Sequence, residues 1–111
     1  ISKVAATNRL SVVEDFCGHG LGQLFHDEAN VVHSARAGTG PELKPGMFFT
    51  IEPMLNLGRK DAAILPDGWT AVTRDRQLSA QFEHSVGVTE NGVEIFTSSP
   101  KGWHTPHTVE L

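Results

Sequence analysis

Three glycines alternate with other residues early in the chain, at Gly18, Gly20 and Gly22. Each glycine inside a helix costs about 1 kcal/mol relative to alanine, so three of them within five positions exclude a continuous helix. Glycine also allows the backbone to turn or to approach another group closely. His19 lies between the first two glycines, and the segment therefore predicts a turn or a close approach of the backbone to another group beside a histidine.

Short apolar runs separated by turn residues predict strands in most of the remaining chain. The residues from 79 to 89 alternate in character and predict one strand, whose apolar face carries Ala80, Phe82, His84, Val86 and Val88. Other runs predict strands at 11–16, 47–51, 70–73 and 93–96.

Turn and loop signals complete the expected architecture. Asn91-Gly92 favours a hairpin turn with positive φ at both positions. Residues 1–10 have the weak helical spacing of a helix end, and 34–46 are rich in glycine and proline, which predicts a loop. The expectation is an α+β, antiparallel, strand-rich unit with little helix over 1–97, followed by an extended tail over 98–111.

Composition excludes several classes of protein. The chain has 111 residues, with 9 basic and 13 acidic side chains and a net charge of −4, which argues against a nucleic-acid partner. No run of apolar residues is long enough to cross a membrane. Cys17 is the only cysteine, so no internal disulfide forms, and a reducing compartment such as the cytoplasm is expected. Because Ile1 is neither an initiating methionine nor part of a signal peptide, a longer parent protein is expected.

Two glutamates occupy positions where the strand pattern disfavours them. Glu52 ends the apolar run 47–51, and Glu83 lies within the run 79–89, with Gln81 and Ser85 on its face. A carboxylate close to a core needs a base, hydrogen-bond donors or a cation. Each glutamate alone is more often exposed or paired with a base, whereas two of them together with glycine-framed histidines favour a functional site.

Two of the histidines are candidate site residues, and the others are assigned no function. His19 and His26 are seven residues apart, so a turn must separate them if both line one site. The further interval of seven to His33 is attributed to chance, and His84 is interpreted as a core histidine. His104 and His107 resemble a loose metal pair, but their irregular surroundings favour no function. Cys17 is interpreted as a small packed side chain rather than a nucleophile.

Four segments of the chain together resemble type I methionine aminopeptidases. The similarity extends over about residues 9–97, and its motifs follow the order found in that family. They are Cys17-Gly18-His19-Gly20-Leu21-Gly22 with Phe25-His26-Asp27-Glu28, then residues 43–54 (LKPGMFFTIEPM), then Asp67-Gly68-Trp69-Thr70, then residues 78–84 (LSAQFEH).

The resemblance implies a fold and a metal site. The fold is the pita-bread fold, in which two α/β halves close around two metal ions, and this chain corresponds to the C-terminal half. By resemblance His19, Glu52 and Glu83 are metal ligands, with Glu83 bridging both ions. A carboxylate-rich donor set with one imidazole suits Mn, Fe(II) or Co more than a structural zinc, although Zn is also possible.

The resemblance also implies the roles of three further residues. His26 contacts the substrate and stabilises the tetrahedral intermediate, and Phe25 and Trp69 line the pocket for a methionine side chain. One departure concerns Ala29, where the family usually has proline after two glutamates; here Asp27 and Glu28 precede it. The implied substrate is the N-terminal methionine of a nascent peptide.

The family has further ligands, two aspartates, in its N-terminal half, so this chain offers three of five. The chain alone is therefore expected to bind at most one ion and to be inactive without that half. It is also expected to expose an apolar face that the missing half covers, around Phe48, Phe49, Ile51 and Val86. Two alternatives stay open: a non-catalytic binding module with the pita-bread fold, and a proline-directed peptidase of the same fold.

Overall fold

One short helix and ten short strands make up residues 1–103, the part of the chain that the structure, a computed structural model, describes. The helix α1 spans Ser2–Thr7, in agreement with the helical spacing of the first residues. The strands are β1 (Ser11–Val12), β2 (Gly18–Gly20), β3 (Asp27–Val31), β4 (Phe48–Ile51), β5 (Met54–Asn56), β6 (Ala62–Ile64), β7 (Ala71–Thr73), β8 (Ser79–Gln81), β9 (His84–Thr89) and β10 (Gly92–Ile95).

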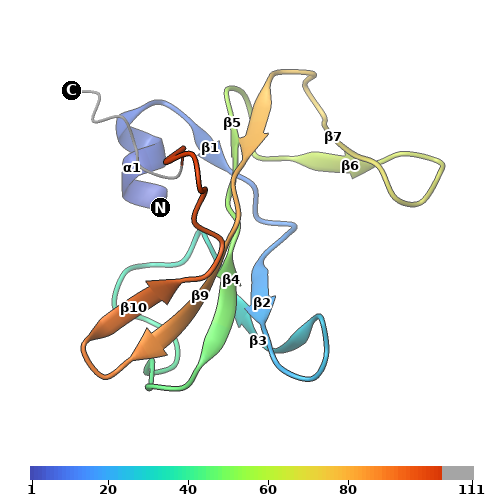
Figure 1. The fold of residues 1–111 in the computed structure, drawn as a ribbon. Coiled ribbons are helices and arrows are strands. Elements are labelled where there is room, and N and C mark those ends of the chain that lie inside the picture. The colour runs from blue at the N-terminus through green and yellow to red at the C-terminus, as the bar shows by residue number, and fades with distance from the viewer. Residues whose placement is uncertain (104–111) are drawn as a thin grey trace.

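The strands form three antiparallel sheets. The largest has the order β10-β9-β4-β2-β3, a second has the order β1-β5-β8, and β6 pairs only with β7. The hairpin β6–β7 projects sideways from the other two sheets (Figure 1). The strand-rich α+β architecture with little helix is confirmed.

The chain crosses between the largest sheet and the second sheet at two places, and each crossing contains a glutamate. The first links β4 to β5 through Glu52 and Pro53, and the other links β8 to β9 through Phe82 and Glu83. Ile51 pairs with His84 on one side of this bend, and Met54 pairs with Gln81 on the other. The register is the same on both sides, so Glu52 lies opposite Glu83 where the two sheets meet.

The prediction of one strand over 79–89 is therefore wrong. The strand is interrupted at Phe82 and Glu83, and Phe82 is 79% exposed instead of lying on an apolar face. The alternation of apolar and polar residues continues through the bend, because it reflects only that successive side chains point to opposite faces of the strand. It carries no information on the pairing partner, which changes here from β5 to β4.

The hairpin turn between β9 and β10 lies one residue earlier than predicted. Thr89 pairs with Gly92, so the two turn residues are Glu90 and Asn91. Gly92 has a φ of 150°, whereas Asn91 is not among the non-glycine residues with positive φ in the described part of the chain. Because Gly92 takes part in the ladder, the expected turn with two positive φ values does not form.

Four strands escaped the sequence analysis: β2, β3, β5 and β6. The strand β3 has the sequence DEANV, in which aspartate, glutamate and asparagine are all disfavoured in strands. It is an edge strand of the largest sheet, where such polar side chains can remain in water. The predicted strands at 47–51, 70–73 and 93–96 and the loop at 34–46 are confirmed within a few residues.

The buried apolar core is small, and it consists of Ala5, Val12, Val13 and Val86. Phe48 and Ile51 are exposed as expected, and Phe49 is half-buried. The expectation for Val86 is wrong, since it is only 3% exposed. Val86 pairs with Phe49 of β4 on one side and with Ile95 of β10 on the other, so neighbouring strands cover it.

Within residues 1–103, no helix has the length and apolar character that crossing a bilayer requires.

Candidate metal centre

The three predicted ligands, His19, Glu52 and Glu83, converge at the junction of the two sheets. Each offers one ligand atom, and these atoms all lie within 4.8 Å of one another. His19, in β2, is 9% exposed, Glu52 is half-buried and Glu83 is exposed. Residues that are distant in the sequence thus form one cluster, with its open side at Glu83.

The ring of His19 has a defined orientation. Its Nδ1 lies 2.9 Å from the carbonyl oxygen of Gly20, which can only accept a hydrogen bond. The tautomer with its proton on Nδ1 makes this hydrogen bond and leaves Nε2 with a lone pair that a metal ion could use. That Nε2 lies 3.6 Å from Oε1 of Glu52. A carbonyl partner on the second nitrogen is the usual arrangement for a metal-binding histidine.

Thr50 connects two of the three predicted ligands. Its hydroxyl accepts a hydrogen bond from the backbone N–H of His19 at 2.9 Å and donates one to Oε1 of Glu52 at 2.7 Å. The side chain is 1% exposed and therefore has little freedom to rotate. One buried hydroxyl thus fixes the position of the Glu52 carboxylate relative to β2.

Glu52 is also held through its backbone. Its N–H donates to Nε2 of His33 at 3.1 Å, and its carbonyl accepts from Nε2 of Gln81 at 3.1 Å. His33 is 5% exposed, and this burial lowers its pKa, although the nearby carboxylate of Glu52 acts in the opposite direction. The spacing of seven carries no information on this contact, which arises because the segment after β3 lies beside Glu52.

The donor atoms of this cluster are of the kinds that hold a divalent cation. Glu52 and Glu83 face each other across an antiparallel pair, an arrangement that destabilises a sheet when both side chains carry the same charge. The lone pair of His19 points at the same place. A divalent ion would relieve this repulsion, so the donor set fits the metal that the sequence predicts. Oxygen-rich sets with one imidazole suit Mn, Fe(II), Co and Zn.

His26 and Phe25 lie beside His19, on the turn between β2 and β3. The ring centroids of His19 and His26 are 4.3 Å apart, and those of Phe25 and His26 are 4.7 Å apart, both edge-on. The turn that must separate the two histidines is thus present. Both side chains of the turn are exposed, which leaves them accessible to a molecule that approaches the metal centre.

Trp69, by contrast, lies on the turn between β6 and β7 and is 88% exposed. Among the described residues, no contact joins it to the cluster around His19, and its place in a methionine pocket stays a prediction. Asp67 shapes this turn, because its carboxylate accepts hydrogen bonds from the hydroxyl of Thr70 and from the backbone N–H groups of Trp69 and Thr70. These bonds lower the pKa of Asp67.

The remaining candidates from the sequence lie apart from these contacts. His84 is half-buried rather than in the core, and its Nδ1 lies 2.9 Å from Oγ1 of Thr97. Cys17 is a free, half-buried cysteine. His104 and His107 lie outside the described residues.

Ala29, where the resembling family has proline, takes an unusual backbone conformation with a φ of 79°. Proline fixes φ near −65°, so a chain with proline here must follow a different course. The register between β2 and β3 shifts at the same place: His19 pairs with Asn30 and Gly20 with Asp27, so Glu28 and Ala29 lie at the irregularity. Whether His26 moves with it stays a prediction.

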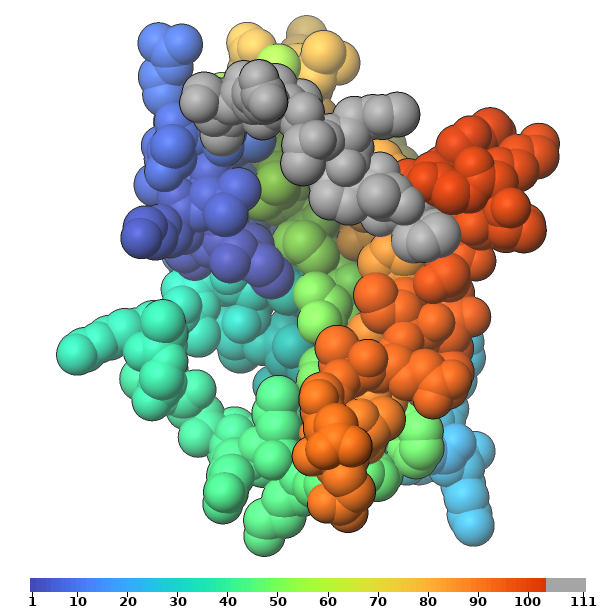
Figure 2. Space-filling model, turned by 60° about the vertical axis from the view of Figure 1, so that its left-hand side comes forward, coloured from blue at the N-terminus to red at the C-terminus, as the bar shows by residue number. Residues whose placement is uncertain are grey.

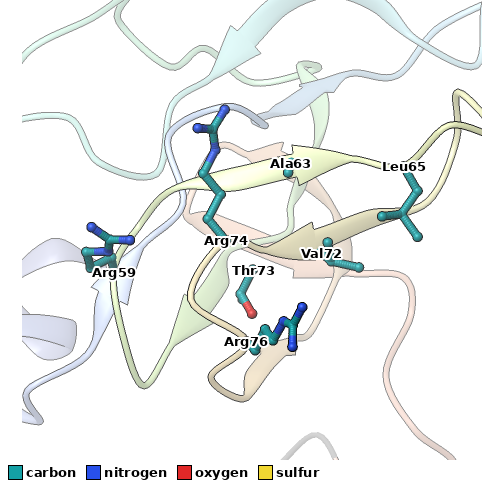
Figure 3. A pocket seen from close by; sticks show the side chains of 7 residues that line it. All are labelled: Arg59, Ala63, Leu65, Val72, Thr73, Arg74 and Arg76. Carbon is teal, nitrogen blue, oxygen red and sulfur yellow. The ribbon is translucent and has the colours of Figure 1, made fainter.

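Two hollows accompany the sheets. One, of about 650 Å³, lies between the strands β3 and β4 and the loop 32–46, which stands away from the body of the chain in Figure 2. The other, of about 730 Å³, lies along the β6–β7 hairpin and contains none of the predicted ligands (Figure 3). Its lining combines apolar strand residues with three arginines, Arg59, Arg74 and Arg76.

Gly18 allows β2 to lie close enough to β4 for these contacts. A Cβ atom at this position would collide with the carbonyl oxygen of Thr50, a backbone atom with little room to move. We expect Gly18→Ala to lower the free energy of unfolding by about 1–3 kcal/mol and to weaken metal binding, as measured by denaturant titration and calorimetry. The matched control is Gly22→Ala, whose Cβ would meet only the end of the Asp27 side chain. Equal stability of the two variants would contradict the explanation.

Comparison with known proteins agrees with this geometry. The sequence model of metallopeptidase family M24 matches residues 1–90. A methionine aminopeptidase of Rickettsia prowazekii is 54% identical over 102 residues, which are 91% of this chain and 39% of the relative. Methionine aminopeptidase 1 of Saccharomyces cerevisiae is 52% identical over 101 residues, which are 91% of this chain and 26% of the relative.

Solved structures agree as well. The crystal structure of the Rickettsia prowazekii methionine aminopeptidase matches with a TM-score of 0.84 and 52% identity, over 86% of this chain and 39% of that one. The Thermotoga maritima enzyme matches with a TM-score of 0.83 and 39% identity, over 86% and 38%. The expected pita-bread architecture is confirmed, and the chain spans about two fifths or less of the length of these relatives. The chain belongs to metallopeptidase family M24.

Proposed function

We propose that this chain is part of a methionine aminopeptidase, a hydrolase that removes the N-terminal methionine from nascent polypeptides in the cytoplasm. The observation that carries the proposal is the convergence of His19, Glu52 and Glu83, with a lone pair and two carboxylates directed at one place. The names of the similar proteins support the choice of substrate.

The complete site is proposed to hold two divalent ions, with Glu83 shared between them. Metal pairs in aminopeptidases activate water and polarise the scissile carbonyl. This chain supplies three donors, and the other two are proposed to come from aspartates in the rest of the catalytic domain. The same part of the protein would cover the exposed side chains of Phe48 and Ile51.

The chain's own residues would orient the substrate. His26 is proposed to donate a hydrogen bond to the oxygen on which negative charge develops, since it is exposed beside the predicted ligand His19. Phe25 offers an apolar ring next to His26 and would contact the methionine side chain. Trp69 would complete this pocket once the rest of the domain is present.

The isolated chain is expected to bind no more than one equivalent of Mn²⁺ or Co²⁺, weakly, and to leave a methionyl peptide intact. The three donors of this chain are too few to complete the coordination of two metal ions. Calorimetry and a peptide assay would be run on the chain alone and on the chain joined to the remaining part of the domain.

Turnover is expected only in the joined form. Two tightly bound ions and full activity in the chain alone would contradict the proposed division of ligands. Two bound ions in the joined form without any turnover of peptides would instead identify a non-catalytic module. Preference for a substrate with proline in second position over a plain methionyl peptide would point to the proline-directed peptidase.

A further inference from the structure

We propose that His33 is a positioning residue for Glu52: it holds the backbone of this predicted metal ligand so that the carboxylate faces His19 and Glu83. The inference rests on the proposed function in one respect, because it takes Glu52 to be a ligand. The contact between His33 and Glu52 is a property of the fold itself.

The inference depends on a hydrogen bond from a backbone N–H to a histidine ring nitrogen. Glu52 lies between β4 and β5, beyond the last ladder pair of each strand. Its backbone N–H therefore donates to a side chain, Nε2 of His33, at 3.1 Å. Buried backbone N–H groups almost always have a partner. At the point where the chain passes from one sheet to the other, His33 supplies the acceptor that a neighbouring strand supplies elsewhere.

His33 is itself well anchored. Its side chain is 5% exposed, and its backbone carbonyl accepts a hydrogen bond from the hydroxyl of Ser2 at 3.2 Å, which ties the segment after β3 to α1. An anchored acceptor can hold a donor in place, whereas an exposed, mobile ring cannot. The bond from His33 thus connects Glu52 to a part of the fold outside both of its own strands.

The contacts of Glu52 divide into two groups. Thr50 binds the carboxylate oxygen Oε1, and Gln81 reaches the carbonyl and, at 3.4 Å, the second oxygen Oε2. Gln81 is exposed, so its two hydrogen bonds to Glu52 lie at the surface. Only His33 holds the N–H of Glu52, so its loss would free the backbone rotation that aims the carboxylate.

The hydrogen bond can be observed directly in the metal-free full chain. With ¹⁵N labelling, an N–H···N hydrogen bond transmits a scalar coupling between the two nitrogens, here the amide of Glu52 and Nε2 of His33. We expect this coupling to be present and to disappear in His33→Leu, which has a similar volume but no acceptor. Absence of the coupling in the unchanged chain would overturn the inference.

The positioning role is tested by Co²⁺ binding, measured by calorimetry and by the visible absorption of the bound ion. His33→Leu is expected to weaken Co²⁺ binding by about 10–100-fold, the usual effect of losing a group that orients a ligand, and to change the absorption spectrum. His33→Gln, whose side-chain carbonyl can accept the same N–H, is expected to recover part of the affinity. Val13→Ala serves as a control that removes buried apolar volume without removing a hydrogen bond to Glu52.

Each outcome has one meaning. If the unchanged chain binds Co²⁺ and His33→Leu binds it equally well with the same spectrum, the positioning role is overturned while the proposed function stands. If Val13→Ala weakens binding as much as His33→Leu, general destabilisation explains the effect and the role is overturned as well. If the chain joined to the remaining part of the domain shows the coupling but binds no Co²⁺, the proposed metal function fails, whereas the contact by which His33 holds the backbone of Glu52 stands.

Discussion

Replacing Glu83 by alanine is expected to abolish turnover of a methionyl peptide by the complete enzyme and to reduce its content of divalent metal. Glu83 is the exposed member of the three-residue cluster, and it lies opposite Glu52 in the register of the β4–β9 and β5–β8 pairs. If it is shared between two ions, its removal takes one donor from each. No other substitution in this chain is expected to have a larger effect on metal content.

The measurement is the metal content by elemental analysis together with the rate of peptide hydrolysis. Because Glu83 is exposed, its loss is expected to leave the folded state intact, and circular dichroism would check this. Glu94→Ala, another exposed glutamate on β10, is the matched control for lost negative charge. Two equivalents of metal bound with unchanged affinity in Glu83→Ala would remove the bridging role from this residue.

The second large effect is expected for His26→Ala in the complete enzyme. A hydrogen bond to a developing oxyanion stabilises the transition state much more than the bound substrate. We therefore expect kcat to fall by about 10²–10³-fold, the usual loss for one such donor, with a similar fall in kcat/KM and little change in KM. The metal content is expected to stay the same, because His26 contacts His19 through its ring and is outside the cluster of three donors.

Steady-state kinetics and metal analysis on the same preparation would check this expectation. Gln23→Ala, an exposed side chain in the same turn between β2 and β3, is the control for a disturbed turn. A loss of metal from His26→Ala would make His26 a ligand and reverse its proposed role. An increase in KM alone would make it a substrate-binding group without a part in the chemical step.

Parts of the fold were predictable because local chemistry decides them. The apolar run before Glu52 forms β4, and the glycines around His19 exclude a helix there, although they did not by themselves predict β2. The charged segment that forms β3 was not predictable from propensity, because its strand conformation depends on pairing with β2. The interruption at Phe82 was equally hidden, since it arises where the strand exchanges one partner for another.

The candidate site was predictable to a similar degree. The resemblance singled out His19, Glu52 and Glu83, and the structure brings them together, although their role as ligands stays a prediction. Neither Thr50 nor His33 was found, because a buried hydroxyl and a buried ring that hold a ligand leave no motif in the sequence. Their signal is a contact between distant residues, from the backbone of His19 to Thr50 and from the backbone of Glu52 to His33, and only the assembled sheets reveal it.

The wide spacing of the three donors along the chain has a thermodynamic consequence. About thirty residues separate each predicted donor from the next, so an ion bound to all three would join three segments that are distant in the sequence and that come together only in the folded chain. An ion that binds only the folded state at 100 times its dissociation constant adds about 2.7 kcal/mol to the free energy of unfolding. For a chain with only four buried apolar side chains among its described residues, that is a large share. A chelator is then expected to lower the free energy of unfolding of the metal-loaded chain by the same amount.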